Sequence, residues 1–509
     1  MELQTIDKRI KVVQTIFDSV DERPLDCDFV LPDYLPDVAA VLKCIVNPAV
    51  QNYQISSDRV MADGIVHMRL WYLDEERRLV HTFENSQPFT AAFTVKDLDS
   101  SCRVQLSATT NYVNCRATGP RRVDIHGAFG VRLKVMGERE ETVIEAIDDS
   151  RVHCQQCHVE YSHQVAFSEK TFTINEVVEL ENGARAESLI RTCAVPRITD
   201  CKKLAGKAVV KGEIVLKTVY LSNTTSGQLC TSENVVLFSQ IVDADGLTEE
   251  QICSCKAALL MYETHPVANP NGEQTLLSFI AKLSVVLHAY ETNTCTVVTD
   301  AYHTAYPLKC RTRTIEPWCA VEHRCETKTM VLSVDCPDTS IRTIEDLWCD
   351  VISTDNHRNG NVNSTAVRLL VSMLTRDEKG VLSYYERPVE CVIDHGEQSG
   401  SYDCEISLLR CVYALAGDHI ELQLHAECCG LVVNTYDYAV IGEMVADEKM
   451  PYTPNEDMKD CCMKVYFASK GESVWDIAKT QHLPLDLLCY ENDLHGEVLT
   501  EDMALLLPL

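Results

Sequence analysis

The sequence predicts a mainly β, multidomain protein, with three tandem β-rich domains followed by a small terminal module of strand, helix, helix and strand. Stretches in which apolar and polar residues alternate, as in half-buried strands, recur along most of the chain. Several of them match one another at a spacing of roughly 150 residues, which is far longer than a solenoid repeat and indicates tandem domains. Over the last ~50 residues, the apolar spacing becomes helical between two short β-prone runs.

A repeat links the first two domains. In each, a strand that begins with glycine is followed, after a loop, by a strand that begins with Glu-Asn and ends with phenylalanine. A long strand comes later in both copies, so the order of the pieces is the same. The matched pairs are Gly64–Tyr72 with Gly212–Tyr220, Glu84–Phe89 with Glu233–Phe238, and Val123–Val135 with Leu276–Tyr290.

A third, fainter copy begins near Pro317 and keeps this order. Its strands are expected at Val367–Leu374, Tyr385–Val389 and Ile420–Val433. The chain then divides into tandem domains, an acidic, proline-containing linker and the terminal module. The predicted boundaries are residues 1–150, 151–300 and 301–446 for the three domains, 447–462 for the linker and 463–509 for the module.

Two short helices are expected inside the β-rich domains. Val38–Cys44 follows a Pro-Asp pair, so Asp37 is expected to cap the start of that helix. The alternative is that Leu31–Asp37 forms a loop that docks a partner. Ala186–Cys193 shows a similar apolar spacing. The adjacent Arg121 and Arg122 lie at a strand start, where ion pairs with acidic neighbours are the expected role.

Local signals define the elements of the terminal module. Val465–Phe467 is a β-prone run, and the turn after it ends at Ser473, a residue type that caps helix starts. Apolar residues at helical spacing follow. Pro484 suits the first turn of a second helix, and Ala504–Leu507 forms a closing apolar strand.

This order and three short motifs resemble the LysM module. The motifs are Gly471-Glu472-Ser473-Val474-Trp475-Asp476-Ile477-Ala478, Leu488-Cys489-Tyr490-Glu491-Asn492 and Leu505-Leu506-Leu507-Pro508. The family has Pro-Gly-Gln before its last strand, whereas this chain has Thr500-Glu501-Asp502. This acidic substitution lies near the sugar-binding groove of the family and weighs against sugar binding.

The LysM resemblance implies binding of N-acetylglucosamine polymers such as peptidoglycan. Contacts in that family come from the loop after the first strand and the loop after the second helix, and the same surface would serve a protein partner. Trp475 is expected to pack in the core of the module. The candidate partner- or glycan-binding residues are Gly471, Glu472, Ser473, Val474, Tyr490, Glu491, Asn492, Asp493 and Leu494.

The β-rich domains resemble the SPOCS domain of sporulation and spore-coat proteins. The resemblance rests on Leu31–Val38, Gly64–Tyr72, Pro88-Phe89 and Gly119–Val123. SPOCS domains followed by a terminal LysM module are the layout of the SipL family. This layout implies a mother-cell scaffold that binds spore coat proteins and docks a SpoIVA-type coat basement-layer ATPase through its LysM module.

Composition excludes several classes of partner. The net charge is −30, so neither nucleic acid nor an anionic membrane surface is an expected partner. No apolar run approaches the ~20 residues that span a bilayer. The first residues lack the apolar stretch of a signal peptide, so a cytoplasmic location is expected. The resemblance to the SipL family implies that this is the mother cell, at the forespore surface.

The 25 cysteines are scattered and are expected to be buried free thiols rather than a disulfide framework. This includes the pairs Cys428-Cys429 and Cys461-Cys462. A separate run has two cysteines at Cys-x-x-Cys spacing, with a histidine on each side. We interpret these cysteines as structural thiols; a zinc site and haem attachment are the alternatives. That run contains His153, Cys154, Cys157 and His158.

No phosphate-binding loop, nucleophile elbow or metalloprotease motif is present, so neither a cofactor nor an enzymatic activity is expected. The leading hypothesis is a non-enzymatic assembly protein. A peptidoglycan-binding cell-wall protein is the first alternative, and a metal or redox protein based on Cys154 and Cys157 is the second.

Overall fold

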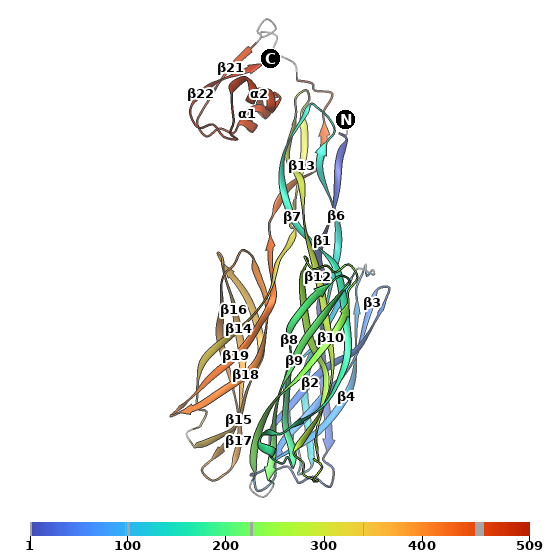
Figure 1. Cartoon of the computed structure of the whole chain (residues 1–509), viewed down its shortest axis with the longest axis vertical. Coiled ribbons are helices and arrows are strands. Elements are labelled where there is room, and N and C mark those ends of the chain that lie inside the picture. Colours follow the sequence, from blue (N-terminus) through green and yellow to red (C-terminus); the bar gives the residue numbers. More distant parts are fainter. Residues whose placement is uncertain are drawn as a thin grey trace.

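A computed structural model describes residues 3–96, 98, 102–223, 227–338, 340–452 and 463–508. The predicted mainly β class is confirmed: strands β1 to β22 make up most of these residues, and they contain two α-helices. Three sets of strands form an elongated lower body that narrows into a stalk of paired strands, with the terminal module at the top (Figure 1).

The first strand set forms two antiparallel three-stranded sheets, ordered β1-β6-β5 and β2-β3-β4. Alternate residues of each strand are buried, so the two apolar faces pack on each other as a sandwich with one continuous core. The strands are β1 (Thr5–Val30), β2 (Ala40–Ser56), β3 (Arg59–Leu73), β4 (Val80–Thr94), β5 (Arg103–Ala117) and β6 (Arg122–Ile147).

The second strand set repeats this topology as β7-β12-β11 and β8-β9-β10, with a short 3-10 helix after its first strand. Its two sheets again enclose one apolar core. The elements are β7 (Val152–Glu179), the 3-10 helix (Glu181–Gly183), β8 (Ser188–Leu204), β9 (Lys207–Asn223), β10 (Gln228–Asp243), β11 (Ile252–Val267) and β12 (Leu276–His303).

The third strand set has the same order, but its two long strands are interrupted. β13 and β14 together occupy the place of the first strand, and β19 and β20 that of the last. The sheets are β14-β19-β18, β15-β16-β17 and the pair β13-β20. The strands are β13 (Leu308–Ile315), β14 (Trp318–Asp335), β15 (Ile341–Asn359), β16 (Val362–Asp377), β17 (Leu382–Glu397), β18 (Ser401–Ala416), β19 (His419–Thr435) and β20 (Tyr438–Ala446).

The repeated Gly…Phe pattern has a structural reason. Gly64 lies opposite Phe89 in the β3–β4 ladder, and Gly212 lies opposite Phe238 in β9–β10. In both places the phenylalanine ring covers the glycine, and a Cβ atom there would collide with the ring and with a backbone oxygen of the neighbouring strand. Glycine is therefore required for this close approach.

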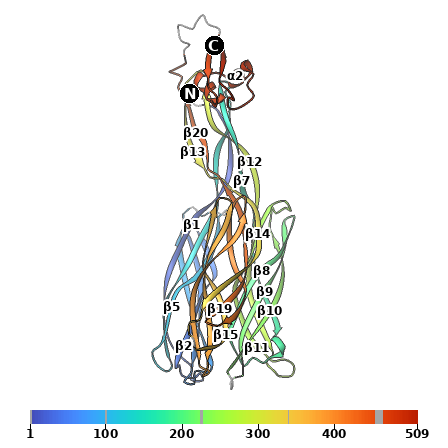
Figure 2. The same ribbon diagram turned by 90° about the vertical axis from the view of Figure 1, so that its left-hand side faces the viewer.

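The stalk, which we call the neck, is built from the upper halves of the long strands. The strand pairs are β1–β6, β7–β12 and β13–β20, and their neck portions pair without a third strand. The three ribbons converge above the body (Figures 1 and 2). Their shared core consists of Ile10, Val143, Val159, Tyr161, Cys295, Val297, Ile315 and Val440.

The three strand sets also meet inside the body. Apolar side chains from β3, β4, β8, β9, β16 and β17 form one shared cluster. Beside it, Arg191 Nε donates to Asp346 Oδ2 at 2.9 Å, and both side chains are buried. The ring of Trp348 lies 4.5 Å from the Arg191 guanidinium and contacts Trp71 edge-on. The body is therefore one packed block.

Both short helices predicted in the β-rich domains are wrong. Val38–Cys44 leads into β2 and Ala186–Cys193 into β8, because each segment pairs with the next strand along the chain and that ladder overrides a weak local helix preference. Asp37 therefore caps no helix; it accepts a hydrogen bond from Arg121 Nη1 at 3.1 Å. The predicted arginine pairing is confirmed, since Arg122 pairs with Asp28.

The expectation of free thiols needs one correction. Cys429 is not a free thiol but forms a disulfide with Cys325, which lies directly opposite it in the β14–β19 ladder. Its neighbour Cys428 is a buried free thiol, as predicted. The pair Cys461-Cys462 lies outside the described residues. The described part of the chain contains no helix with the length and hydropathy of a membrane-spanning segment.

Candidate partner-binding site

The terminal module consists of β21 (Met463–Ala468), α1 (Val474–Gln481), α2 (Leu485–Asn492) and β22 (Met503–Pro508). The predicted order of strand, helix, helix and strand is thus observed, and β21 and β22 pair antiparallel. Ser473 caps α1 as predicted, because its side chain accepts a hydrogen bond from the Asp476 amide at 3.3 Å. The helices and the ladder enclose a small apolar core, and Tyr302 of β12 is buried in the same cluster.

The two predicted binding loops are joined by a third segment. The Gly471 amide donates to Leu499 O at 2.9 Å, and the Val474 amide donates to Glu497 O at 3.0 Å. Residues 495–499 directly follow the loop after α2, so these bonds connect the two loops through one continuous strip of backbone. Gly471 has φ +91°, a conformation that favours glycine.

Several of the predicted binding residues have structural roles instead. Val474 is only 2% exposed and belongs to the core, so it cannot contact a partner. Asn492 ties the end of α2 to β22 by exchanging hydrogen bonds with the backbone of Leu506. Glu472 accepts hydrogen bonds from the hydroxyl of Tyr466 and the amide of Ser469.

The remaining candidates form an exposed face. Tyr490 is 82% exposed and is flanked by the exposed carboxylates of Glu491 and Asp493. Leu494 is half-buried against the core, and its neighbouring loop exposes half of Val498. This set, which we call the Tyr490 face, combines one aromatic ring with acidic and apolar neighbours.

Sequence reasoning missed a second exposed surface of the module. Val465 and Leu506 lie opposite each other on the outer face of the β21–β22 ladder, and Phe467 beside them is 80% exposed. The alternation of Val465 and Phe467 with inward-facing Tyr466 and Ala468 was the available signal.

The module packs on the tip of the neck through α1. The indole N–H of Trp475 donates to Asp300 Oδ2 at 2.8 Å, and Lys479 Nζ lies 2.6 Å from the same oxygen. The Tyr302 hydroxyl donates to Leu483 O at 2.6 Å, and its ring contacts the indole edge-on. Trp475 is buried within the module core as predicted, and it is also a contact to the second strand set.

Electrostatics support this joint. Burial alone would raise the pKa of Asp300, but the hydrogen bonds from Lys479 and Trp475 outweigh it, so the pKa of the carboxyl lies below its ordinary value. Two histidines stack on tyrosines at the joint, His153 on Tyr302 and His482 on Tyr452. Burial lowers the pKa of both imidazoles.

The side chains of the Cys-x-x-Cys run diverge, which favours the preferred interpretation of structural thiols over the zinc alternative. Cys154 and Cys157 are three residues apart on β7, so their side chains point to opposite faces of the strand. The Cys154 thiol packs in a cluster at the tip of the neck and the Cys157 thiol in the central neck core. His153 stacks on Tyr302, and His158 contacts Thr296. These residues therefore cannot share one ion.

Two regions of the chain, residues 37–118 and 185–265, match the family model described as "SipL, SPOCS domain". In the structure these regions cover β2–β5 and nearly all of β8–β11, the same four strands of the first two strand sets. Among curated proteins, none matches the chain. The recognition of SPOCS domains is thereby confirmed for the first two sets, and the match indicates a sporulation-related protein.

Proposed function

Because the chain is a SPOCS-domain protein related to SipL, we propose that it is a non-enzymatic scaffold of spore coat and envelope assembly. In this proposal the strand sets of the body bind spore coat proteins, and the terminal module, assigned as LysM, docks a coat basement-layer ATPase of the SpoIVA type. The third strand set is assigned as a divergent SPOCS domain because it shares the topology of the first two. The place of action is the mother cell, at the forespore surface.

One observation carries the docking proposal: the Tyr490 face remains exposed although the module packs on the neck. The neck contacts come from α1 and the segment after it, through Trp475, Lys479 and Leu483. Tyr490 lies on α2 and is 82% exposed. The neck therefore presents the module at one end of a long molecule with this face free for a partner (Figure 1).

The chemistry of the face suits a protein partner with a basic rim. An exposed aromatic ring is a common centre of protein interfaces, because it buries a large area at little entropic cost. Leu494 and Val498 supply apolar contact nearby, while carboxylates at Glu491, Asp493 and Glu501 would select complementary positive charge.

The alternative function, binding of peptidoglycan, is favoured by the same exposed tyrosine, since an aromatic ring can stack on a sugar ring. Against this, Tyr490 is followed by the exposed carboxylates of Glu491 and Asp493. Asp502 accepts a hydrogen bond from the Lys470 amide at 2.7 Å. The acidic Thr500–Asp502 segment replaces the family's Pro-Gly-Gln and weighs against the sugar.

A competition experiment with the full-length chain separates the two functions. The purified chain is offered, in separate tubes, to the purified ATPase and to washed peptidoglycan. The proposal expects retention on the ATPase that soluble N-acetylglucosamine oligomers do not compete away. Retention on peptidoglycan alone would contradict it and favour the cell-wall function.

A further inference from the structure

Three groups that ligate metal ions converge inside the third strand set. They are the imidazole of His395 on β17 and the thiols of Cys404 on β18 and Cys428 on β19. One ligand atom from each lies within 4.8 Å of the other two. All three side chains are buried, with exposed fractions of 3%, 2% and 0%.

The strand register explains the convergence. Cys404 lies opposite Gly430, and Cys428 lies opposite Ile406, so the two thiols are diagonal neighbours on one face of the β18–β19 ladder. A side chain at Gly430 would collide with the backbone of Asp403, so glycine permits this close approach. His395 comes from the other sheet of the sandwich, so the cluster spans both sheets.

We propose that His395, Cys404 and Cys428 bind a zinc-class divalent cation that ties together the two sheets of the third strand set. Two thiolates and one imidazole are a known protein ligand set of zinc when water or another small ligand completes the tetrahedron, with bonds of about 2.3 Å to sulfur and about 2.0–2.1 Å to nitrogen. Tetrahedral ligands at those bond lengths lie roughly 3.5–3.8 Å apart, so small movements of the three side chains close the site. Two thiolates also balance the charge of the ion.

The imidazole already has the outer partners that metal sites use. Glu326 Oε1 lies 2.7 Å from His395 Nδ1, and Thr365 Oγ1 lies 2.9 Å from Nε2. Whichever nitrogen binds the ion, the other keeps a partner that fixes the ring, as in carboxylate–histidine–zinc arrangements. The charge of Glu326 is itself balanced by Arg324 and Lys328, at 3.0 and 3.4 Å.

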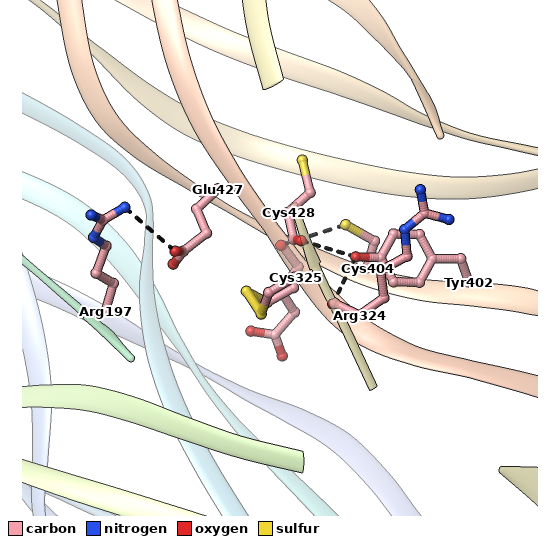
Figure 3. The surroundings of a disulfide bond; sticks show 9 residues. Arg197, Arg324, Cys325, Tyr402, Cys404, Glu427 and Cys428 are labelled. Atoms are coloured by element: carbon pink, nitrogen blue, oxygen red, sulfur yellow. Dashed lines mark hydrogen bonds and ion pairs between the residues drawn. A yellow bond between two sulfur atoms is a disulfide. The ribbon is translucent and has the colours of Figure 1, made fainter. Parts of the chain in front are cut away.

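Other cysteines in the described part of the third strand set lack the combination of two thiols and one imidazole. Cys429 lies next to Cys428 in the sequence but on the opposite face of β19, where it forms the disulfide with Cys325. Figure 3 shows this disulfide at Cys325, with Cys404 and Cys428 nearby. Cys349 and Cys411, 3.9 Å apart in the same sandwich, have no imidazole in a shared cluster. Within the described residues, the three-ligand set occurs once. This proposal is independent of the proposed function.

The first test measures metal in the full-length chain. The reduced protein is loaded with zinc, desalted and assayed for zinc content, and X-ray absorption then reports the ligands. We expect about one zinc per chain, bound by two sulfurs and one nitrogen at the distances given above. Alkylation mapped by mass spectrometry should show Cys404 and Cys428 protected by zinc. No retained zinc, or protection of other thiols instead of these two, would each overturn the proposal.

Substitutions supply the second test. Cys404→Ser and Cys428→Ser should each lose the zinc, and His395→Gln should weaken binding at least 10-fold. Cys411→Ser is the matched control, because it removes a thiol from the same sandwich without touching the cluster, and it should keep one zinc. Circular dichroism confirms folding; if a variant unfolds, the protection map of the unaltered chain still decides. Full zinc retention in both cysteine variants, or equal loss in the control, would contradict the assignment.

Discussion

Two joints in this molecule use the same kind of ion pair in different surroundings. In the body, Arg191 and Asp346 connect the second and third strand sets with side chains only 8% and 3% exposed. At the tip of the neck, Lys479 and Asp300 connect the terminal module to the second set with side chains 40% and 31% exposed. Both pairs have an aromatic partner, Trp348 in the body and Trp475 at the neck.

The difference in burial indicates different functions for the joints. Breaking a buried pair leaves a charge without water or partner, whereas an exposed pair exchanges its contact for hydration. We therefore expect the body to behave as one cooperative block and the module to be held in place by a weaker contact.

The largest expected effect comes from the body joint. Asp346→Ala leaves Arg191 buried without its carboxylate and should lower the free energy of unfolding by about 3–5 kcal/mol. Denaturant unfolding of the full chain measures this. The double substitution with Arg191→Met removes both charges of this pair and should recover part of the loss, because Lys217, whose Nζ lies 3.4 Å from Asp346 Oδ1, still loses its carboxylate partner. A loss below about 1 kcal/mol in the single variant would mean that this pair does not hold the strand sets together.

Trp475→Ala should have the next largest effect, about 3 kcal/mol, because it empties part of the module core. The unfolding should be confined to residues 463–508, which hydrogen exchange can locate. Trp475→Phe is the matched control: it keeps an aromatic ring in the core and removes the N–H donor to Asp300. Unchanged exchange in α1 of the alanine variant would show that the core assignment is wrong.

Asp300→Asn should weaken the neck joint by about 1 kcal/mol, since it removes a half-exposed ion pair. The stability of the body should be unchanged, while exchange of the α1 amides should increase. A pair of dyes, one attached to the module and one to the neck, would report any change in the distance between the two. A loss of body stability comparable to that of Asp346→Ala would erase the distinction between the two joints.

A smaller effect is expected from pH. His153 and His482 have lowered pKa values in the packed joint, so a released module binds protons more readily than a packed one. Packing should therefore weaken as the pH falls below the ordinary histidine value of about 6.5. Asp300 stays ionised there, because its pKa is lowered.

The same dye pair, measured between pH 7.5 and 5.5, checks the pH effect. His482→Phe keeps a ring stacked on Tyr452 and should reduce the pH dependence. If the module packs more tightly on the neck as the pH falls, the prediction is wrong.

Local signals in the sequence predicted much of the fold. The Gly64 and Phe89 pattern, with its counterpart at Gly212, identified the repeat because a close strand approach requires glycine. Within the described ladder of β16 with β17, no glycine lies opposite a phenylalanine, although the topology recurs. The third copy is faint for this reason, and the family match covers only the first two.

Features that depend on strand register could not be predicted. The disulfide partner of Cys429 is 104 residues away, and the ligands His395, Cys404 and Cys428 follow no spacing motif because three strands bring them together. The roles of the site residues could likewise be predicted only in part. Motif matching identified the binding loops, but the burial of Val474 and the contact between Trp475 and Asp300 follow from tertiary packing.

The most direct test of the scaffold proposal is the dissociation constant of the full-length chain with the purified ATPase, compared with that of Tyr490→Ala. Tyr34→Ala is the matched control, since Tyr34 is also 82% exposed but lies in the body. If the Tyr490 face is the contact, Tyr490→Ala should weaken binding roughly 10-fold or more, as expected for an interface aromatic, while Tyr34→Ala leaves it unchanged. Equal affinity of all three proteins would contradict the account.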